Sequence, residues 1–260
     1  MNNIRKLTDS LFWVGINDRR IALFENVYPV PTGMSYNSYV LLDEKTALFD
    51  TVDASFTHDF LENVTAALKG RTLDYLIVNH MEPDHCATLG EIVRRYPEVK
   101  VVCNSKTVPI IKQFYNFDID SRAVIVKEND TFCTGRHTFT FIMAPMVHWP
   151  EVMVEYDEAD KILFSADGFG RFGALSQSCT YDAAGKAQDV LEHEWTGEAR
   201  RYFINIVGKY GANVQGLLKK AAVLDIEKIA PLHGPVLTGG LEYFLDKYAK
   251  WSSYQPEEKG

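Results

Sequence analysis

Four side chains that could bind a metal ion lie in the six-residue run His80-Met81-Glu82-Pro83-Asp84-His85, one residue after the apolar residues 76–78. Imidazole nitrogens and carboxylate oxygens are common ligands of iron and zinc. Three further residues of these types stand alone downstream, at His148, Asp167 and His233. Seven nitrogen and oxygen ligands suffice for two metal ions that share one bridging carboxylate, so the sequence predicts a binuclear metal site.

The crowding within this run favours a metal site over a purely structural role. Like charges packed behind a strand repel one another, which makes the arrangement costly without a compensating cation. Alternate residues of an extended turn point the same way, and Pro83 would stiffen such a turn. We therefore expect an extended turn in which His80, Glu82 and Asp84 converge.

The remaining histidines lack such neighbours, and Cys86, which follows His85, is expected near the metal ions without binding them. We expect ordinary surface or capping roles for the other histidines, namely His58, His137 and His193. The four cysteines are widely spaced and form no C-x-x-C pair: Cys86, Cys103, Cys133 and Cys179. They are predicted to be reduced, because disulfides are rare in the cytosol.

Short strands must position the ligand-type residues. Runs rich in β-forming residues predict strands over residues 75–78, 162–164 and 226–230, and His80, Asp167 and His233 each follow one of them. His148 follows another predicted strand, over residues 138–143. Sites in α/β sheets gather at the carboxyl ends of strands, where a rigid scaffold holds the loops. The scattered ligand-type residues therefore share one structural setting.

The rest of the pattern predicts an α/β fold. Further strands are expected over residues 11–14, 21–24, 38–42, 46–50, 99–103, 123–126 and 152–155, and helices over residues 56–68, 87–96, 107–115, 188–208, 213–224 and 241–251. Two strand-rich halves, each followed by helices, indicate two sheets packed on each other with helices on both outer faces. No repeat or linker interrupts the pattern, so residues 1–260 are predicted to form a single domain.

Composition limits the class of protein. Apolar residues make up 46% of the 260 residues, which is enough for a continuous core. The formal charge of −8 disfavours nucleic acid as a partner, because phosphate binding needs a basic surface. No apolar run approaches the roughly 20 residues that a membrane span requires, and no signal-type stretch follows the N-terminus. We expect a cytoplasmic protein that binds neither nucleic acid nor a membrane.

The sequence resembles the diiron domain of flavodiiron proteins. The resemblance rests on the H-x-E-x-D-H run, on His148-Trp149-Pro150, on residues 164–170 around Asp167 and on His233-Gly234-Pro235. Residues 35–39, 47–52 and 225–231 also match, so the resemblance covers nearly the whole chain. It implies a metallo-β-lactamase-like αββα sandwich, in which helices flank two mixed β-sheets.

The resemblance also implies which residue binds which metal ion. By the family pattern, one iron would be held by His80, Glu82 and His148. The other iron would be held by Asp84, His85 and His233. Asp167 would bridge the two.

The sequence departs from the family pattern in one large respect. Flavodiiron proteins carry a flavodoxin domain after this module, and its FMN passes electrons to the irons. This chain stops at Gly260 and contains no glycine-rich phosphate loop. We therefore expect a relative of stand-alone oxygen-binding diiron proteins, with no FMN bound by this chain. An external electron donor, such as rubredoxin or a flavoprotein, would then be needed. A homodimer is expected from the resemblance alone.

Glu82 favours iron and redox chemistry. Most proteins of this fold are zinc hydrolases with histidine at this position. Two divalent ions, three carboxylates and one bridging hydroxide sum to a net charge near zero, and additional anionic ligands favour a higher-valent metal such as Fe(III). We expect two non-haem irons with an oxo or hydroxo bridge that bind and reduce O2 or NO. Such a protein acts as a reductase or as an oxygen sensor with a signalling partner. The alternative, a dinuclear zinc hydrolase, stays open.

Overall fold

The first of two large mixed sheets is formed by the N-terminal half of the chain. The computed structural model describes residues 3–257. This sheet has the order β1 (Arg5–Lys6), β2 (Leu11–Trp13), β7 (Tyr39–Leu42), β8 (Thr46–Phe49), β9 (Tyr75–Ile77), β10 (Lys100–Cys103) and β11 (Ala123–Ile125). Pairing is antiparallel from β1 to β8 and parallel from β8 to β11.

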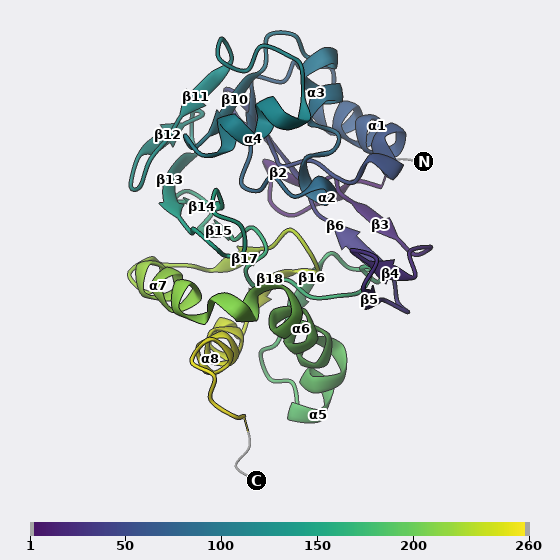
Figure 1. Cartoon of the computed structure of the whole chain (residues 1–260), viewed down its shortest axis with the longest axis vertical. Helices are drawn as coiled ribbons and strands as arrows, with labels where there is room; N and C mark the ends of the chain where they lie inside the picture. Colours follow the sequence, from purple (N-terminus) through teal and green to yellow (C-terminus); the bar gives the residue numbers. More distant parts are fainter. Residues whose placement is uncertain (1–2, 258–260) are drawn as a thin grey trace. The chain divides into compact units, whose positions relative to one another are not determined.

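Parallel pairing requires helical crossovers, because each new strand must start again at the same end of the sheet. Three helices supply these connections: α1 (Thr57–Leu68), α3 (Leu89–Arg95) and α4 (Thr107–Phe114). In Figure 1 all three helices are drawn in the upper part of the view, where β10 and β11 also lie. Their apolar residues, such as Val64 and Ile92, are fully buried. These helices therefore connect strands β8 to β11 and bury their apolar side chains in the core of the first unit.

The second large sheet carries the other ligand-type residues. Its order is β12 (Thr131–Cys133), β13 (Thr138–Met143), β14 (Met153–Asp157), β15 (Ile162–Phe164), β17 (Lys228–Ala230), β18 (Val236–Gly239) and β16 (Thr180–Asp182). β15 and β17 are parallel, and Phe164 lies opposite Ala230. Two-stranded sheets join β3 (Ile16–Asp18) to β6 (Met34–Tyr36) and β4 (Leu23–Phe24) to β5 (Tyr28–Pro29).

The chain forms two compact units. The first unit comprises Met1–Ile16, Tyr36–Ile142 and Glu155–Asp160, and the second comprises Asn17–Ser35, Met143–Val154 and Lys161–Gly260. Each unit has its own apolar core. In the first unit, Leu76 and Val101 of neighbouring strands are fully buried. In the second unit, the buried ring of Trp195 packs edge-on against Phe244, with 4.6 Å between ring centroids.

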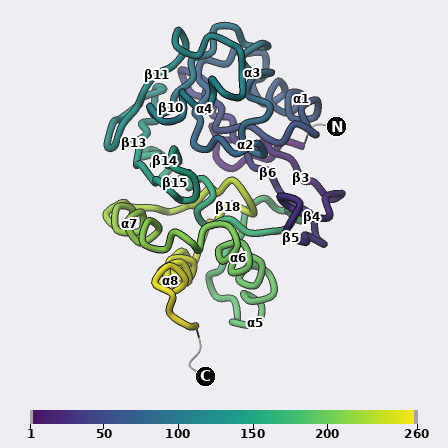
Figure 2. The backbone as a smooth tube through the Cα atoms, viewed as in Figure 1, coloured from purple at the N-terminus to yellow at the C-terminus, as the bar shows by residue number. Residues whose placement is uncertain are grey.

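Helices of the second unit follow the predicted ranges with one irregularity. Residues 188–210 are helical and comprise α5 (Gln188–Leu191), η2 (Glu192–Thr196), α6 (Gly197–Tyr202), η3 (Phe203–Val207) and η4 (Gly208–Tyr210). Two of these segments, η2 and η3, are π-helical. α7 (Gly211–Ala221) and α8 (Leu241–Ser252) lie side by side, as Figure 2 shows. A π turn adds one residue to a helical turn, which hydrophobic periodicity does not reveal.

The prediction of two mixed sheets flanked by helices is confirmed. The expected extended turn over the ligand run is wrong beyond Glu82, because Pro83 begins a short helix, α2 (Pro83–Cys86). Proline is favoured at the first helical position, where its fixed φ suits the helix and its missing N–H is not needed. Asp84 and His85 are therefore helical, whereas Glu82 is extended.

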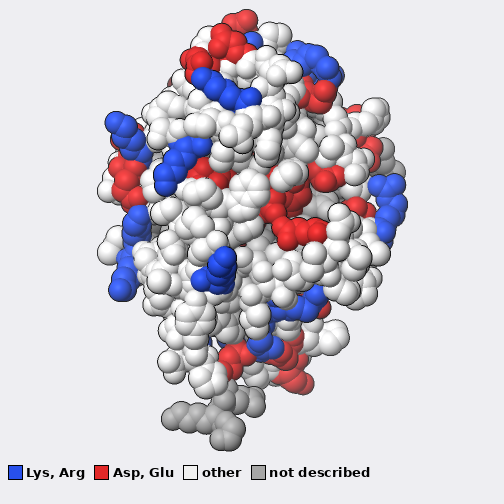
Figure 3. All heavy atoms as spheres, in the orientation of Figure 1, with Lys and Arg blue, Asp and Glu red and all other residues white. Residues whose placement is uncertain are grey.

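The state of the cysteines is the one that the sequence predicts. All four cysteines are free; Cys133 is exposed and the other three are buried. Acidic and basic side chains are interspersed on the face drawn in Figure 3. Among the helices of residues 3–257, none combines the length and apolar character that crossing a membrane would require.

His137 is buried, so the expectation of an ordinary surface or capping residue is wrong. Its side chain lies in the first unit with Nδ1 2.8 Å from Asp157 Oδ2 and Nε2 2.9 Å from Ser10 Oγ. Burial alone would lower the pKa of His137. The hydrogen bond and charge of Asp157, with the charges of Asp160 and Asp43, outweigh that effect and raise the pKa. An ion pair therefore joins β14 to the residue before β13.

We expect Asp157→Asn to destabilise the metal-free protein in a pH-dependent way. A histidine whose pKa is raised by folding stabilises the fold fully below its unfolded value of about 6.5 and loses this contribution as pH rises through the folded value. The substitution should lower the free energy of unfolding by about 1–3 kcal/mol at pH 5.5, and by less at pH 9. Urea unfolding across this range measures the difference. His58→Gln, an exposed control, should change little; an equal loss at both pH values would contradict the ion pair.

Candidate metal centre

The ligand run of the first unit forms two acid–imidazole pairs. His80 Nε2 lies 3.3 Å from Glu82 Oε2, and His85 Nε2 lies 3.4 Å from Asp84 Oδ2. The two imidazole rings are 5.7 Å apart, measured between centroids. Each pair offers ligand atoms within 4.8 Å of each other. Within this unit the run therefore presents one nitrogen and one oxygen ligand to each of two neighbouring positions.

Parallel strand pairing holds the start of this run. β8 and β9 end side by side, with Phe49 opposite Ile77. Asp50, the residue after β8, accepts the main-chain N–H groups of Asn79 and His80 at 2.8 and 3.2 Å. Thr51 donates from both its N–H and its hydroxyl to the His85 carbonyl, each at 2.8 Å. The end of β8 thus fixes the main chain at both ends of the run.

Asp50 is itself fully buried. Burial raises the pKa of the Asp50 carboxyl to about 6. The charge of His85, the N–H groups of Asn79 and His80, and the charge of His80 lower the pKa and offset part of this effect. The N–H donors are the partners that a buried carboxylate needs.

In the second unit, Asp167 lies between two imidazoles. Its Oδ2 is 3.1 Å from His148 Nε2, and its Oδ1 is 3.7 Å from His233 Nε2. Asp167 and His233 come three residues after Phe164 and Ala230, which are opposite each other in the parallel pair of β15 and β17. The strand register therefore brings these two residues together. A carboxylate with one oxygen toward each of two imidazoles has the arrangement of a bridging ligand.

His233 is oriented by the main chain. Its Nδ1 lies 2.7 Å from the Ser35 carbonyl oxygen, so Nδ1 carries the proton and donates it to this acceptor. Gly234 N donates to Ser35 Oγ at 2.7 Å. Histidines that bind metals usually donate their second ring nitrogen in this way, which fixes the tautomer and the ring orientation. His233 Nε2 is therefore the nitrogen available to a metal.

Aromatic rings surround His233 and keep water from it. The ring of Phe24 lies edge-on with 5.5 Å between centroids, and the ring of Tyr202 lies 5.4 Å away. Phe172 packs against both Phe24 and Tyr202. A low-dielectric wall of this kind strengthens the interaction of a buried carboxylate with a cation.

Burial and donor chemistry fit metal ions. His80, Asp167 and His233 are inaccessible to solvent, and Glu82 and Asp84 are less than a tenth exposed. Buried carboxylates require pairing or metal coordination. All seven residues offer nitrogen or oxygen, the ligands that suit iron and zinc. The His, Asp and Glu clusters within the units could therefore bind metal; the assignment of all seven residues to one binuclear centre stays a prediction.

The predicted site residues do not include Asp50, Asn79, Glu155 or Ser35. Asp50 and Ser35 lie in stretches that matched the family pattern, which is the signal that could have found them. Asn79 directly precedes the ligand run. Glu155 occupies an inward position of an apolar strand and gives no local signal.

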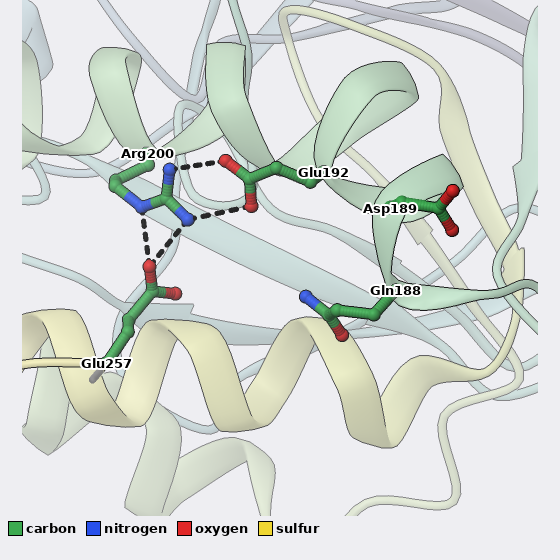
Figure 4. Close-up of a pocket in the computed structure, with 5 residues that line it drawn as sticks. All are labelled: Gln188, Asp189, Glu192, Arg200 and Glu257. Atoms are coloured by element: carbon green, nitrogen blue, oxygen red, sulfur yellow. Dashed lines mark hydrogen bonds and ion pairs between the residues drawn. The ribbon is translucent and has the colours of Figure 1, made fainter. Parts of the chain in front are cut away.

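A separate hollow of about 870 Å³ in the second unit is a charged surface feature (Figure 4). Arg200 donates to both carboxylate oxygens of Glu192 at 2.6 and 2.9 Å and to Glu257 Oε2 at 2.6 Å. Lys247 and the Trp251 indole N–H contact Glu257 Oε1. The charges of Arg200, Lys247, Glu192 and Glu257 therefore compensate one another within this hollow.

Two mixed sheets with metal-ligand residues at the carboxyl ends of their strands define a metallo-β-lactamase-like protein. The family model described as "ODP family beta lactamase" matches residues 34–234. The chain belongs to this family.

Flavodiiron proteins are among its relatives, which confirms the resemblance seen in the sequence. The chain is 29% identical to the flavodiiron protein of Giardia intestinalis, with a TM-score of 0.88 over 97% of this chain and 60% of that one. It is 28% identical to rubredoxin oxygen:oxidoreductase of Desulfovibrio gigas, with a TM-score of 0.88 over 98% and 62%. It is 30% identical to a nitric oxide reductase of Moorella thermoacetica over 97% of this chain and 62% of the relative. The chain thus spans about three fifths of these relatives.

Replacing Asp167 with asparagine tests its role as a ligand. Asp167→Asn keeps the shape but removes the charge, so we expect the affinity for Co(II) to fall at least about 100-fold. Titration of metal-free protein with Co(II) measures this. Asp157→Asn removes an equally buried carboxylate that also contacts a histidine, and it should keep the affinity of the wild type. Unchanged binding by Asp167→Asn would contradict the assignment.

Proposed function

We propose that this chain is a non-haem diiron protein that binds and reduces a diatomic molecule, O2 or NO, with electrons from an external donor. The observation that carries the proposal is Asp167, which directs one oxygen to His148 and the other to His233. A carboxylate placed in this way can bridge two adjacent metal ions, which two-metal sites hold about 3.5–4 Å apart. The family relationship and the two acid–imidazole pairs of the ligand run support the same conclusion.

In the proposed centre, the ligands are assigned as the family pattern implies. One iron takes His80, Glu82 and His148. The second iron takes Asp84, His85 and His233. Asp167 bridges them.

Glu82 supports iron rather than zinc. With Glu82, Asp84 and Asp167, the centre has three carboxylates and four neutral imidazoles. Histidine at the position of Glu82 would leave the centre with one more positive charge. Additional anionic ligands favour a metal that reaches a higher oxidation state, and zinc has no redox chemistry. When bound, iron supplies the electrons that reduce the diatomic molecule.

The residues around the ligands orient them and exclude water. Asp50 holds the His80 main chain, and the Ser35 carbonyl fixes the His233 tautomer. Phe24 and Tyr202 pack beside the His233 ring and limit access of water to it. A dry, rigid site is the protein's main contribution to reactions that a metal cofactor carries out.

The names of the relatives support both diatomic substrates. One relative is a nitric oxide reductase, and another is a rubredoxin oxygen:oxidoreductase. We infer that rubredoxin or a flavoprotein donates electrons to this chain. An oxygen sensor that passes its oxidation state to a signalling partner is the second form of the same proposal.

Metal content separates iron chemistry from zinc chemistry. Protein purified without oxygen and loaded with Fe(II) should bind about two ions per chain and change its optical spectrum when O2 is added. Elemental analysis and anaerobic absorption spectroscopy measure these quantities. Colourless protein that retains two zinc ions and hydrolyses thioesters or phosphodiesters would contradict the proposal and favour a zinc hydrolase.

Steady-state turnover identifies substrate and role. We expect iron-loaded protein with reduced rubredoxin to consume O2 or NO over many turnovers, because each cycle returns the irons to Fe(II). An oxygen electrode and an NO electrode measure the two rates under identical conditions. Glu82→His should reduce either rate at least about tenfold by lowering the anionic charge on the metal. One stoichiometric oxidation, with no further turnover, would contradict the reductase and favour the sensor.

A further inference from the structure

A fully buried polar cluster lies behind the ligand run in the first unit. Asp50 follows β8, Asn79 follows β9, and Glu155 lies in β14; none is more than 2% exposed. The amide nitrogen Nδ2 of Asn79 donates to Asp50 Oδ2 at 2.9 Å and to Glu155 Oε1 at 3.0 Å. Asp50 Oδ1 accepts the N–H groups of Asn79 and His80. One amide therefore links Glu155 to the start of the ligand run.

The hydrogen bonds indicate which of the two carboxyl groups holds a proton. Asp50 accepts three N–H groups, whereas Glu155 accepts one, and its Oε2 makes no hydrogen bond with any described residue. Neither carboxyl forms an ion pair with a lysine or arginine of residues 3–257. Two buried carboxylates that share one amide would repel each other, so the group with more donors keeps the charge. That group is Asp50.

The electrostatics of Glu155 agree with this assignment. Burial raises the pKa of Glu155 well above its ordinary value; the Asn79 hydrogen bond lowers it in part, and the charge of Asp50 raises it further. The groups that face Glu155 are Asp50, from the end of β8, and Asn79, from the end of β9. Neither supplies the positive charge that an ionised Glu155 would need.

We propose that Glu155 is a protonated positioning residue, which fixes the Asn79 amide and thereby the Asp50 contact that orients His80. This inference rests on the proposed role of His80 as a metal ligand. The carbonyl oxygen of the neutral acid accepts the Asn79 N–H. Its hydroxyl is a hydrogen-bond donor, and Asn79 Oδ1 is an acceptor that also lacks a hydrogen-bond partner among the described residues. Loss of the acid leaves the Asn79 amide free to turn and weakens its hold on Asp50.

Glutamine at position 155 tests the proton directly. Glu155→Gln places a carbonyl and a permanent donor where the protonated acid has them. A carboxyl whose pKa is raised by folding stabilises the fold fully below its unfolded value, and this contribution is lost as pH rises toward the folded value. The Tm of metal-free Glu155→Gln should therefore match the wild type near pH 4.5 and exceed it by at least about 3 °C at pH 8. A Tm below the wild type at pH 8 would overturn the proposal.

Co(II) binding tests the positioning role. Glu155→Leu removes both hydrogen-bonding atoms, so we expect Co(II) affinity to fall about 10–100-fold and the visible Co(II) spectrum to change. Glu155→Gln should restore both the affinity and the spectrum. Asp157→Asn, a buried acid on the same strand, should lower stability and leave the spectrum unchanged. The same spectral change in Asp157→Asn would show that general destabilisation is responsible and would overturn the proposal.

The two proposals fail in different ways. Wild-type protein that binds neither Fe(II) nor Co(II) would refute the diiron function, while the pH dependence of metal-free Glu155→Gln would still decide whether Glu155 is protonated. Wild-type protein that binds metal normally, together with a Glu155→Gln variant that loses its spectrum, would refute only the role of Glu155. If Glu155→Leu does not fold, Glu155→Gln decides the outcome alone.

Discussion

Parallel strand pairing is the constraint on which the ligand positions depend. The end of β15 lies beside the end of β17, so residues at equal distances after the two strands meet, as Asp167 and His233 do. The pairing of β8 with β9 places Asp50, the residue after β8, within hydrogen-bonding distance of the His80 N–H. In both units, the hydrogen bonds between paired strands fix the point at which each following loop begins. The loops then need only a few polar contacts to complete the geometry.

Two histidines of this protein show how the same side chain serves different purposes. Both ring nitrogens of His137 have protein partners, Asp157 and Ser10, and the pair is complete without a further ion. His233 donates one nitrogen to a carbonyl and directs the other toward Asp167. The second arrangement is the one that metal-binding histidines usually have, because the ring nitrogen that does not donate stays available to a metal ion. The residue type alone does not distinguish the two roles. The hydrogen-bond partner of each ring nitrogen does.

The sequence predicted the elements well where local chemistry decides them. Amphipathic spacing gave α1 and α8, and alternating β-formers gave β13 and β15, to within one or two residues. The ligand-type residues were found because four of them lie in one run. What escaped prediction depends on distant partners. His137 meets Ser10 from 127 positions away, and Glu155 meets Asn79 from 76 positions away. The strands β1 and β5 have two residues each, too few to show a period.

The thiol pattern has a practical consequence. Cys133 on β12 is exposed, whereas Cys86, Cys103 and Cys179 are buried. Burial raises the pKa of Cys86 and Cys103 to about 12, so these thiols stay protonated and unreactive at neutral pH. A maleimide fluorophore would attach at Cys133 in the unaltered sequence. The native chain thus carries its own attachment point for a dye whose quenching would report the binding of a coloured protein.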